Sequence, residues 1–159
     1  MIDQYARQYG TGDMLINLDS DEEGIFTAGC AGGSTATLTL PMKRESEMDC
    51  LTLSLCGLPG GHSGADIHTG RASANLLLGR LLAALPDVRL VSVEGGSKDN
   101  AITREATAVI AVSHVAMASM TLLGLSDDIA GELVPEDQNC RIVCERLTEQ
   151  ETAAVSGMM

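Results

Sequence analysis

The chain has 159 residues, of which 22 are acidic and 10 are basic, so its formal net charge is −12. A surface this acidic repels nucleic-acid phosphates and anionic membrane headgroups, which excludes both as general partners. The length suits a single domain. The sequence shows neither a leader that is basic and then apolar nor an apolar run of roughly 18 residues. Its five cysteines include no zinc-type CxxC pair, and together these features predict a cytoplasmic protein.

The first forty residues predict short strands. Residues 13–19 form a brief apolar run that ends in an acid, which indicates a buried strand with Asp19 at its carboxyl end. Residues 25–28 form a second short strand between glycines. From 34 to 40, alanine and leucine alternate with threonine, and this period of two predicts a half-buried strand.

Longer elements follow from residue 50 onward. Alternating or continuous apolar runs predict strands over 50–56, 88–93, 105–112 and 138–147. Leucines spaced i, i+3, i+4, i+7 predict a helix over 71–85, which Pro86 ends. A second helix is expected over 114–133, broken near Gly124, with Ser126 as the cap of its second part.

The order strand, helix, strand, strand, helix, strand belongs to the ferredoxin-like split βαβ arrangement. The expected fold class is therefore α+β, with an antiparallel sheet, both helices on one face, and short strands before it. Cys140 and Cys144 share one face of the last strand, which favours burial in the core over catalysis. Residues 148–159 predict no element and indicate a frayed or cut end.

Three stretches carry residue types that are suited to chemistry. The acidic cluster 19–23 suits cations that accept oxygen ligands, although an acidic turn is also simply well solvated. The run GLPGGHSG (57–64) exposes His62, whose imidazole can donate to an anionic transition state, shuttle a proton or bind metal. The alternative is a glycine-rich hairpin turn with an incidental histidine. Asn100 and Arg104 are suited to binding a substrate carboxylate, or else are solvated turn residues.

Together these stretches resemble the aminoacyl-histidine dipeptidase (peptidase D) family of di-zinc metallopeptidases. The resemblance extends over roughly residues 10–115 and consists of an ordered set of short motifs. They are LINLDSDEEG (15–24), GCAGG (29–33), LSLCGLPGGHSG (53–64), DIHTG (66–70), ANLL (74–77), GG (95–96) and NAITREA (100–106).

The resemblance implies a hydrolase that cleaves Xaa-His and other dipeptides with two zinc ions or other divalent metals. It implies that Asp19 is a metal ligand. It also implies that His62 is a catalytic residue in a smaller lid domain, where this histidine stabilises the tetrahedral intermediate and often reaches across to the partner subunit. Asn100 and Arg104 would bind substrate. The lid, built on a ferredoxin-like sheet, would also form a homodimer.

The same resemblance shows departures. The family's remaining metal ligands, its bridging aspartate and its general-base glutamate lie before the position of Met1, and its last histidine ligand lies beyond Met159. Residues 1–31 would be the end of the first catalytic segment and 32–159 an incomplete lid. One aspartate falls short of the usual three or four zinc ligands, so the isolated chain is expected to be inactive. Thr103 replaces a usual proline, which would loosen the turn that presents Asn100.

Two other interpretations remain open at this point. One is a non-enzymatic dimerisation or binding module that uses the same sheet. The other is a degraded remnant, which the Thr103 substitution and the weak resemblance after about residue 115 would fit. Codons upstream for an HxD motif and a Glu-Glu pair would favour the enzyme.

Overall fold

The computed structural model describes residues 23–25, 34–39, 41 and 49–152. The chain divides into two units, Met1–Met42 and Lys43–Met159, and each is considered by itself. The predicted strand over 13–19, its Asp19 and nearly all of the strand over 25–28 lie outside the described residues.

The strand predicted over 34–40 is wrong for the part that the structure describes. Residues 34–39 have no strand conformation and are exposed, and Leu38 keeps 91% of its side chain accessible. A strand is stabilised by ladder hydrogen bonds to a neighbouring strand and by burial of one face. No described residue pairs with 34–39, so within the described part of the chain the alternating pattern has no ladder partner.

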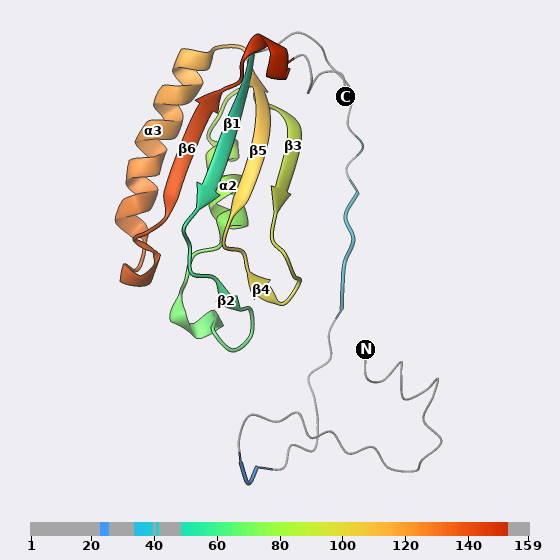
Figure 1. Cartoon of the computed structure of the whole chain (residues 1–159), viewed down its shortest axis with the longest axis vertical. Helices are drawn as coiled ribbons and strands as arrows, with labels where there is room; N and C mark the ends of the chain where they lie inside the picture. Colours follow the sequence, from blue (N-terminus) through green and yellow to red (C-terminus); the bar gives the residue numbers. More distant parts are fainter. Residues whose placement is uncertain (1–22, 26–33, 40, 42–48, 153–159) are drawn as a thin grey trace. The chain divides into compact units, whose positions relative to one another are not determined.

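The second unit contains a four-stranded antiparallel sheet within the described residues (Figure 1). Its strands are β1 (Asp49–Cys56), β3 (Arg89–Gly95), β5 (Ala106–Val112) and β6 (Arg141–Arg146). The strand order is β3-β5-β1-β6, and all three pairings are antiparallel. The sequence order with this spatial order is the split βαβ arrangement, so the predicted fold class is confirmed.

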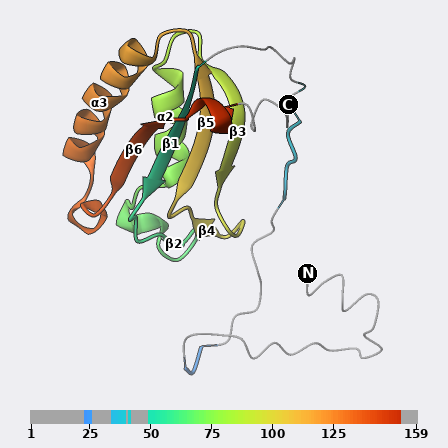
Figure 2. The same ribbon diagram turned by 45° about the horizontal axis from the view of Figure 1, so that its top comes forward.

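Two helices, α2 (Ala74–Ala83) and α3 (Val115–Glu132), cover one face of this sheet (Figure 2). Alternation along β1 turns Leu51, Leu53 and Leu55 toward the helices, where they are buried. They pack with apolar residues from β5 and both helices, chiefly Leu78, Leu81, Ile110, Leu122 and Ile129. Each such side chain contributes about 1.5–3 kcal/mol when it is fully buried, so this layer holds the domain together.

Helix α3 is continuous, so the predicted break near Gly124 is wrong. Ser126 is not a cap, because its hydroxyl donates to the carbonyl of Leu122 one turn earlier, at 2.7 Å. One glycine inside a helix costs about 1 kcal/mol. Burial of Leu122 and Ile129 on either side of Gly124 exceeds that cost and carries the helix through.

Several short elements carry no sequence signal long enough to detect. They are β2 (Gly61–His62), β4 (Ala101–Ile102), η1 (Ile67–Thr69) and η2 (Pro135–Asp137). A further correction concerns the region after 147, because residues 149–152 form a helical turn. Thr148 and Glu151 cap it reciprocally: the Glu151 carboxylate accepts from the Thr148 amide at 2.8 Å, and the Thr148 hydroxyl accepts from the Glu151 amide at 3.3 Å. This is a capping box, readable in the sequence as TEQE.

Candidate functional site

A small antiparallel ribbon brings together two of the predicted functional stretches. Strand β2 pairs with β4, with Gly61 opposite Ile102 and His62 opposite Ala101. The amide of Ser63 also donates to the carbonyl of Asn100 at 2.9 Å. We call these paired segments, β2 and β4, the ribbon. His62 and Asn100, 38 positions apart in sequence, therefore lie side by side at the end of the domain where β1 ends and β5 begins (Figure 1).

Two glycines before His62 allow the chain segments to approach this closely. Gly60 has φ of 67°, and a Cβ there would collide with the side chain of Arg104. Gly61 has φ of 153°, and a Cβ there would lie 2.8 Å from a carboxylate oxygen of Asp66. Both positions therefore require glycine, for conformation and for space.

The His62 imidazole has one nitrogen fixed and the other available. Its Nδ1 accepts hydrogen bonds from the amides of Gly64 at 3.0 Å and Ala65 at 3.1 Å. An Nδ1 that accepts carries no hydrogen in the neutral ring, so the hydrogen is assigned to Nε2. The His62 amide in turn donates to Asp66 at 2.7 Å, which anchors the backbone. The exposed side chain thus presents an N–H donor in a defined direction.

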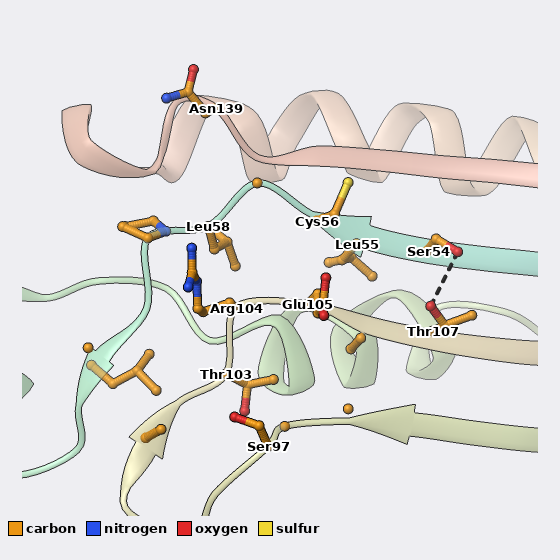
Figure 3. A pocket seen from close by; sticks show the side chains of 18 of the residues that line it. Ser54, Leu55, Cys56, Leu58, Ser97, Thr103, Arg104, Glu105, Thr107 and Asn139 are labelled. Atoms are coloured by element: carbon orange, nitrogen blue, oxygen red, sulfur yellow. Dashed lines mark hydrogen bonds between the residues drawn. The ribbon is translucent and has the colours of Figure 1, made fainter.

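Arg104 lines a hollow of about 1040 Å³ at this end of the sheet. Figure 3 shows its side chain reaching toward Leu58, away from the start of β5. Arg104 is the one basic residue that lines the hollow, which also contains Glu94, Glu105 and Glu136. Among the described residues its guanidinium has no hydrogen bond or ion pair, so its planar fork is available for an anionic ligand.

The structure brings together three of the four predicted site residues. His62 and Asn100 are joined by the ribbon, and the Arg104 side chain lies against Gly60 at its base. The lining of the hollow includes Arg104 but neither His62 nor Asn100. The fourth residue, Asp19, lies outside the described residues. The part of the chain that the structure describes contains no group of three His, Cys, Asp or Glu side chains placed to hold a metal ion.

Thr103, which stands at the position where proline was expected, is buried. Its carbonyl accepts from the Ala74 amide at 2.9 Å, and the Asn100 carbonyl accepts from Ser63. These bonds tie the backbone on both sides of the turn.

The four described cysteines are buried or partly buried. Cys140 and Cys144 pack against the apolar cluster, as predicted, and Cys50 is buried on the other face of the sheet. Burial raises the pKa of all three thiols. Because the thiolate is the nucleophile, a raised pKa disfavours covalent chemistry at these positions.

Two further residues of this region were missed by sequence reasoning. Asp137 is fully buried and accepts a hydrogen bond from the amide of Ala72 at 2.7 Å. Arg71 donates to the carbonyl of Gly60 at 2.8 Å. Charged residues are exposed in most proteins, so no pattern in the sequence distinguishes a buried aspartate in a turn from a solvated one.

No helix within the described residues combines the length and apolar character needed to cross a membrane.

Comparison with known proteins gives a consistent family. The model of the peptidase dimerisation domain matches residues 53–134. The cytosol non-specific dipeptidase of Escherichia coli (strain K12) is 38% identical over 152 residues, which is 91% of this chain and 31% of the relative. The chain therefore spans about a third of the length of this curated relative.

Solved structures give the same result. Aminoacylhistidine dipeptidase from Vibrio alginolyticus superposes with a TM-score of 0.61 at 32% identity, covering 72% of this chain and 26% of that one. An amidase of the hydantoinase/carbamoylase family from Burkholderia multivorans has a TM-score of 0.50 at 13% identity, over 64% of this chain and 27% of that one. The second match shows the fold alone.

Proposed function

This chain belongs to the peptidase dimerisation domain family, and we propose that it is the lid and dimerisation part of a cytoplasmic, metal-dependent dipeptidase. In this proposal residues 32–159 are part of the lid and 1–31 the end of a catalytic segment. The observation that supports the proposal is the ribbon, in which the His62 ring is held through Nδ1 on a glycine-permitted turn and the next residue, Ser63, is hydrogen-bonded to the Asn100 carbonyl.

His62 is the catalytic residue of this proposal. Hydrolysis of a peptide bond passes through a tetrahedral intermediate in which the former carbonyl oxygen bears negative charge. A donor already directed at that oxygen stabilises the charge without reorganisation, and one such donor is worth about 2.7–4 kcal/mol. The two amides that hold Nδ1 keep Nε2 as the donor, so the ring is prepared for this role before substrate arrives.

Asn100 and Arg104 are the proposed substrate-binding residues. A dipeptide has a terminal carboxylate close to its scissile bond, and Arg104, which has no partner among the described residues, can bind it through two parallel hydrogen bonds. Asn100 directly precedes Ala101, the pairing partner of His62, and its carbonyl accepts from the Ser63 amide, so the two predicted residues belong to neighbouring backbone positions.

We infer that the metal belongs to a longer parent protein, with zinc the expected ion, two ions in the site and Asp19 as one ligand. The described residues do not fit a metal site, because they contain no cluster of three ligating side chains. The role proposed for His62 therefore rests on its own hydrogen bonds and not on contact with a metal.

A homodimer through this domain is the proposed assembly. Apolar side chains are exposed along the outer side of α3, where Met117, Met120 and Leu123 keep more than half of their surface accessible. Within the described residues, the outer edge of β3 is also unpaired. Both surfaces suit a second copy of the chain better than water.

The test is a dipeptidase assay of the longer parent protein and of the 159-residue chain, each with an Xaa-His dipeptide. We expect hydrolysis by the parent, loss of that activity with a chelator, and none from the chain alone with added zinc. A parent without activity would favour the second candidate, a dimerisation module, which the match to a dimerisation domain also supports. Hydrolysis by the chain alone would contradict the assignment of the missing ligands to a longer parent.

A further inference from the structure

The stretch of residues 70–74, from the end of η1 to the first residue of α2, connects three parts of the functional end. Arg71 donates to the carbonyl of Gly60, directly before β2. The next residue, Ala72, donates its amide to Asp137 in η2. Two residues later, the amide of Ala74 donates to the carbonyl of Thr103, directly after β4. Both strands of the ribbon and the turn before β6 are thus tied to one five-residue stretch, 70–74.

Asp137 and Arg71 are unusual because each is incompletely satisfied. The Oδ1 atom of Asp137 and the Nε atom of Arg71 are buried, and neither has a hydrogen-bond partner among the described residues. Leaving a buried polar atom without a partner costs stability, and the cost is larger for groups that carry charge. An uncharged turn would hold the same backbone at lower cost, so these two side chains suggest a requirement other than stability.

We propose that Asp137 and Arg71 are positioning residues that fix the direction of the His62 imidazole. Asp137 holds Ala72, and the adjacent Arg71 reaches Gly60, two residues before His62. The Nη1 atom of Arg71 also lies 3.0 Å from the position that a Cβ of Gly61 would occupy, so the Arg71 side chain packs directly against β2.

The consequence is a defined backbone for residues 60–65. The hydrogen bonds from Gly64 and Ala65 to Nδ1 require that backbone to hold its turn. Without the link from η2, the turn can relax, Nδ1 loses its donors, and the hydrogen is free to occupy either ring nitrogen. The inference relies on the proposed function only for its use in catalysis, since the geometry itself concerns the chain alone.

The experiment observes the His62 ring directly, by NMR of the ¹⁵N-labelled 159-residue chain. It measures the ring ¹⁵N shifts of His62, which report the tautomer, and the hydrogen exchange of the Gly64 and Ala65 amides. The variants are Asp137→Ala and Arg71→Met, with Asp137→Asn as the conservative variant that keeps an oxygen for Ala72.

Two controls separate positioning from stability. Glu132→Ala removes a two-bond side-chain contact with Arg80, and neither residue belongs to the ribbon or to stretch 70–74. Ile129→Val trims a fully buried side chain of α3 and lowers global stability, and Ile129 takes no part in the hydrogen bonds of Arg71, Ala72 and Ala74.

We expect Asp137→Ala and Arg71→Met to average the two His62 tautomers and to speed exchange of both amides by about tenfold or more. Asp137→Asn should keep the wild-type ring ¹⁵N shifts of His62 and the wild-type amide exchange of Gly64 and Ala65, and both controls should leave these values unchanged. Changes no larger than those of Ile129→Val would overturn the inference. If Asp137→Ala does not fold, Arg71→Met decides, because Arg71 lies in a loop outside the apolar core.

The two proposals can fail separately. An unchanged His62 signature in these variants would remove the positioning role and leave the proposed function standing. Normal turnover of a His62→Ala parent enzyme would remove the catalytic role and leave the positioning geometry standing.

Discussion

The helix-covered sheet and the ribbon end of this domain are stabilised by different interactions. The sheet and its two helices are held by many buried aliphatic side chains, and β1 makes ladders with two neighbours. The ribbon pairs only two residues with two others and depends on single hydrogen bonds from Ser63, Arg71 and Ala74. The core therefore distributes its stability over many contacts, whereas the ribbon concentrates it in a few.

This difference separates fold from function. Loss of one contact in the core costs stability but leaves the sheet in place, because neighbouring residues still bury the same layer. Loss of one contact at the ribbon changes the direction of a side chain by an amount that matters for chemistry. The following substitutions test that contrast, from the largest expected effect to the smallest.

Leu53→Ala should give the largest loss of stability. Leu53 has no accessible surface, so truncation leaves a cavity, and the free energy of unfolding should fall by about 2–5 kcal/mol. Denaturant unfolding of the chain checks this value. Leu76→Ala is the matched control on the same apolar residue type. Leu76 is 72% exposed, and its truncation should change stability by no more than about 0.5 kcal/mol. Equal losses from both would contradict the core assignment.

In the longer parent enzyme, His62→Ala should have the opposite effect to Leu53→Ala: it should lower turnover and leave stability nearly unchanged. Because a donor used only in the transition state is lost, the turnover number should fall by about 10²–10³-fold, with KM and metal content nearly unchanged. Thermal unfolding should also be nearly unchanged, since the side chain is exposed. His68→Ala, at another exposed histidine six residues later, is the control.

A subunit-mixing experiment sharpens the same prediction. If His62 acts on the partner's site, His62→Ala subunits mixed with Asp19→Ala subunits should recover part of the activity, because some hybrid dimers keep one intact site. Loss of metal in His62→Ala would instead identify a ligand.

Most of the helix-covered sheet could be predicted from sequence, for a physical reason. Burial on one face imposes a period, and Leu51, Leu53 and Leu55 or the leucines of 71–85 display it over several turns or pleats. The same rule misplaced a strand at 34–39, because periodicity records a face that can be buried but not whether a partner strand is present. The predicted break at Gly124 rested instead on the glycine and a possible Ser126 cap, and burial on both sides outweighs that local propensity.

The candidate site could be predicted only as residue types. The glycine-rich run and the Asn100 to Arg104 stretch were recognisable, but their juxtaposition depends on two-residue strands that have no period. The roles of Arg71 and Asp137 were not visible at all, because both act through backbone groups of residues distant in sequence. Only the fold shows those contacts.

Exchanging glycine for alanine should have opposite signs in the two regions. Gly60→Ala introduces a Cβ at φ of 67° that collides with Arg104 and with the carbonyl of Ile102. We expect a loss of about 1–3 kcal/mol, with faster amide exchange across the ribbon. Gly124→Ala places a Cβ in open space on a continuous helix and should stabilise by about 0.5–1 kcal/mol. Denaturant unfolding compares them, and a stabilising Gly60→Ala would contradict the described turn.

The smallest effect is expected at the exposed contact between α2 and the end of α3. Arg80 donates two hydrogen bonds to Glu132, at 2.7 and 2.9 Å, and these bonds lower the pKa of the Glu132 carboxyl below its ordinary value of 4.5. A lowered carboxyl pKa in the folded state contributes stability above the unfolded pKa, and that contribution disappears as the pH falls through the folded value. Because both side chains are exposed, solvent screens the pair, and the effect on unfolding should be barely measurable.

Carboxyl NMR titration resolves this effect where unfolding does not. In Arg80→Met, the pKa of Glu132 should return toward its ordinary value. Glu151 is the internal control, since Thr148 lowers its pKa through the backbone amide and the hydroxyl, and Arg80→Met should leave it unchanged. A Glu132 pKa that stays low without Arg80 would show that the contact between the two helices is not made as described. It would also weaken the choice of Glu132→Ala as a control for the positioning of His62.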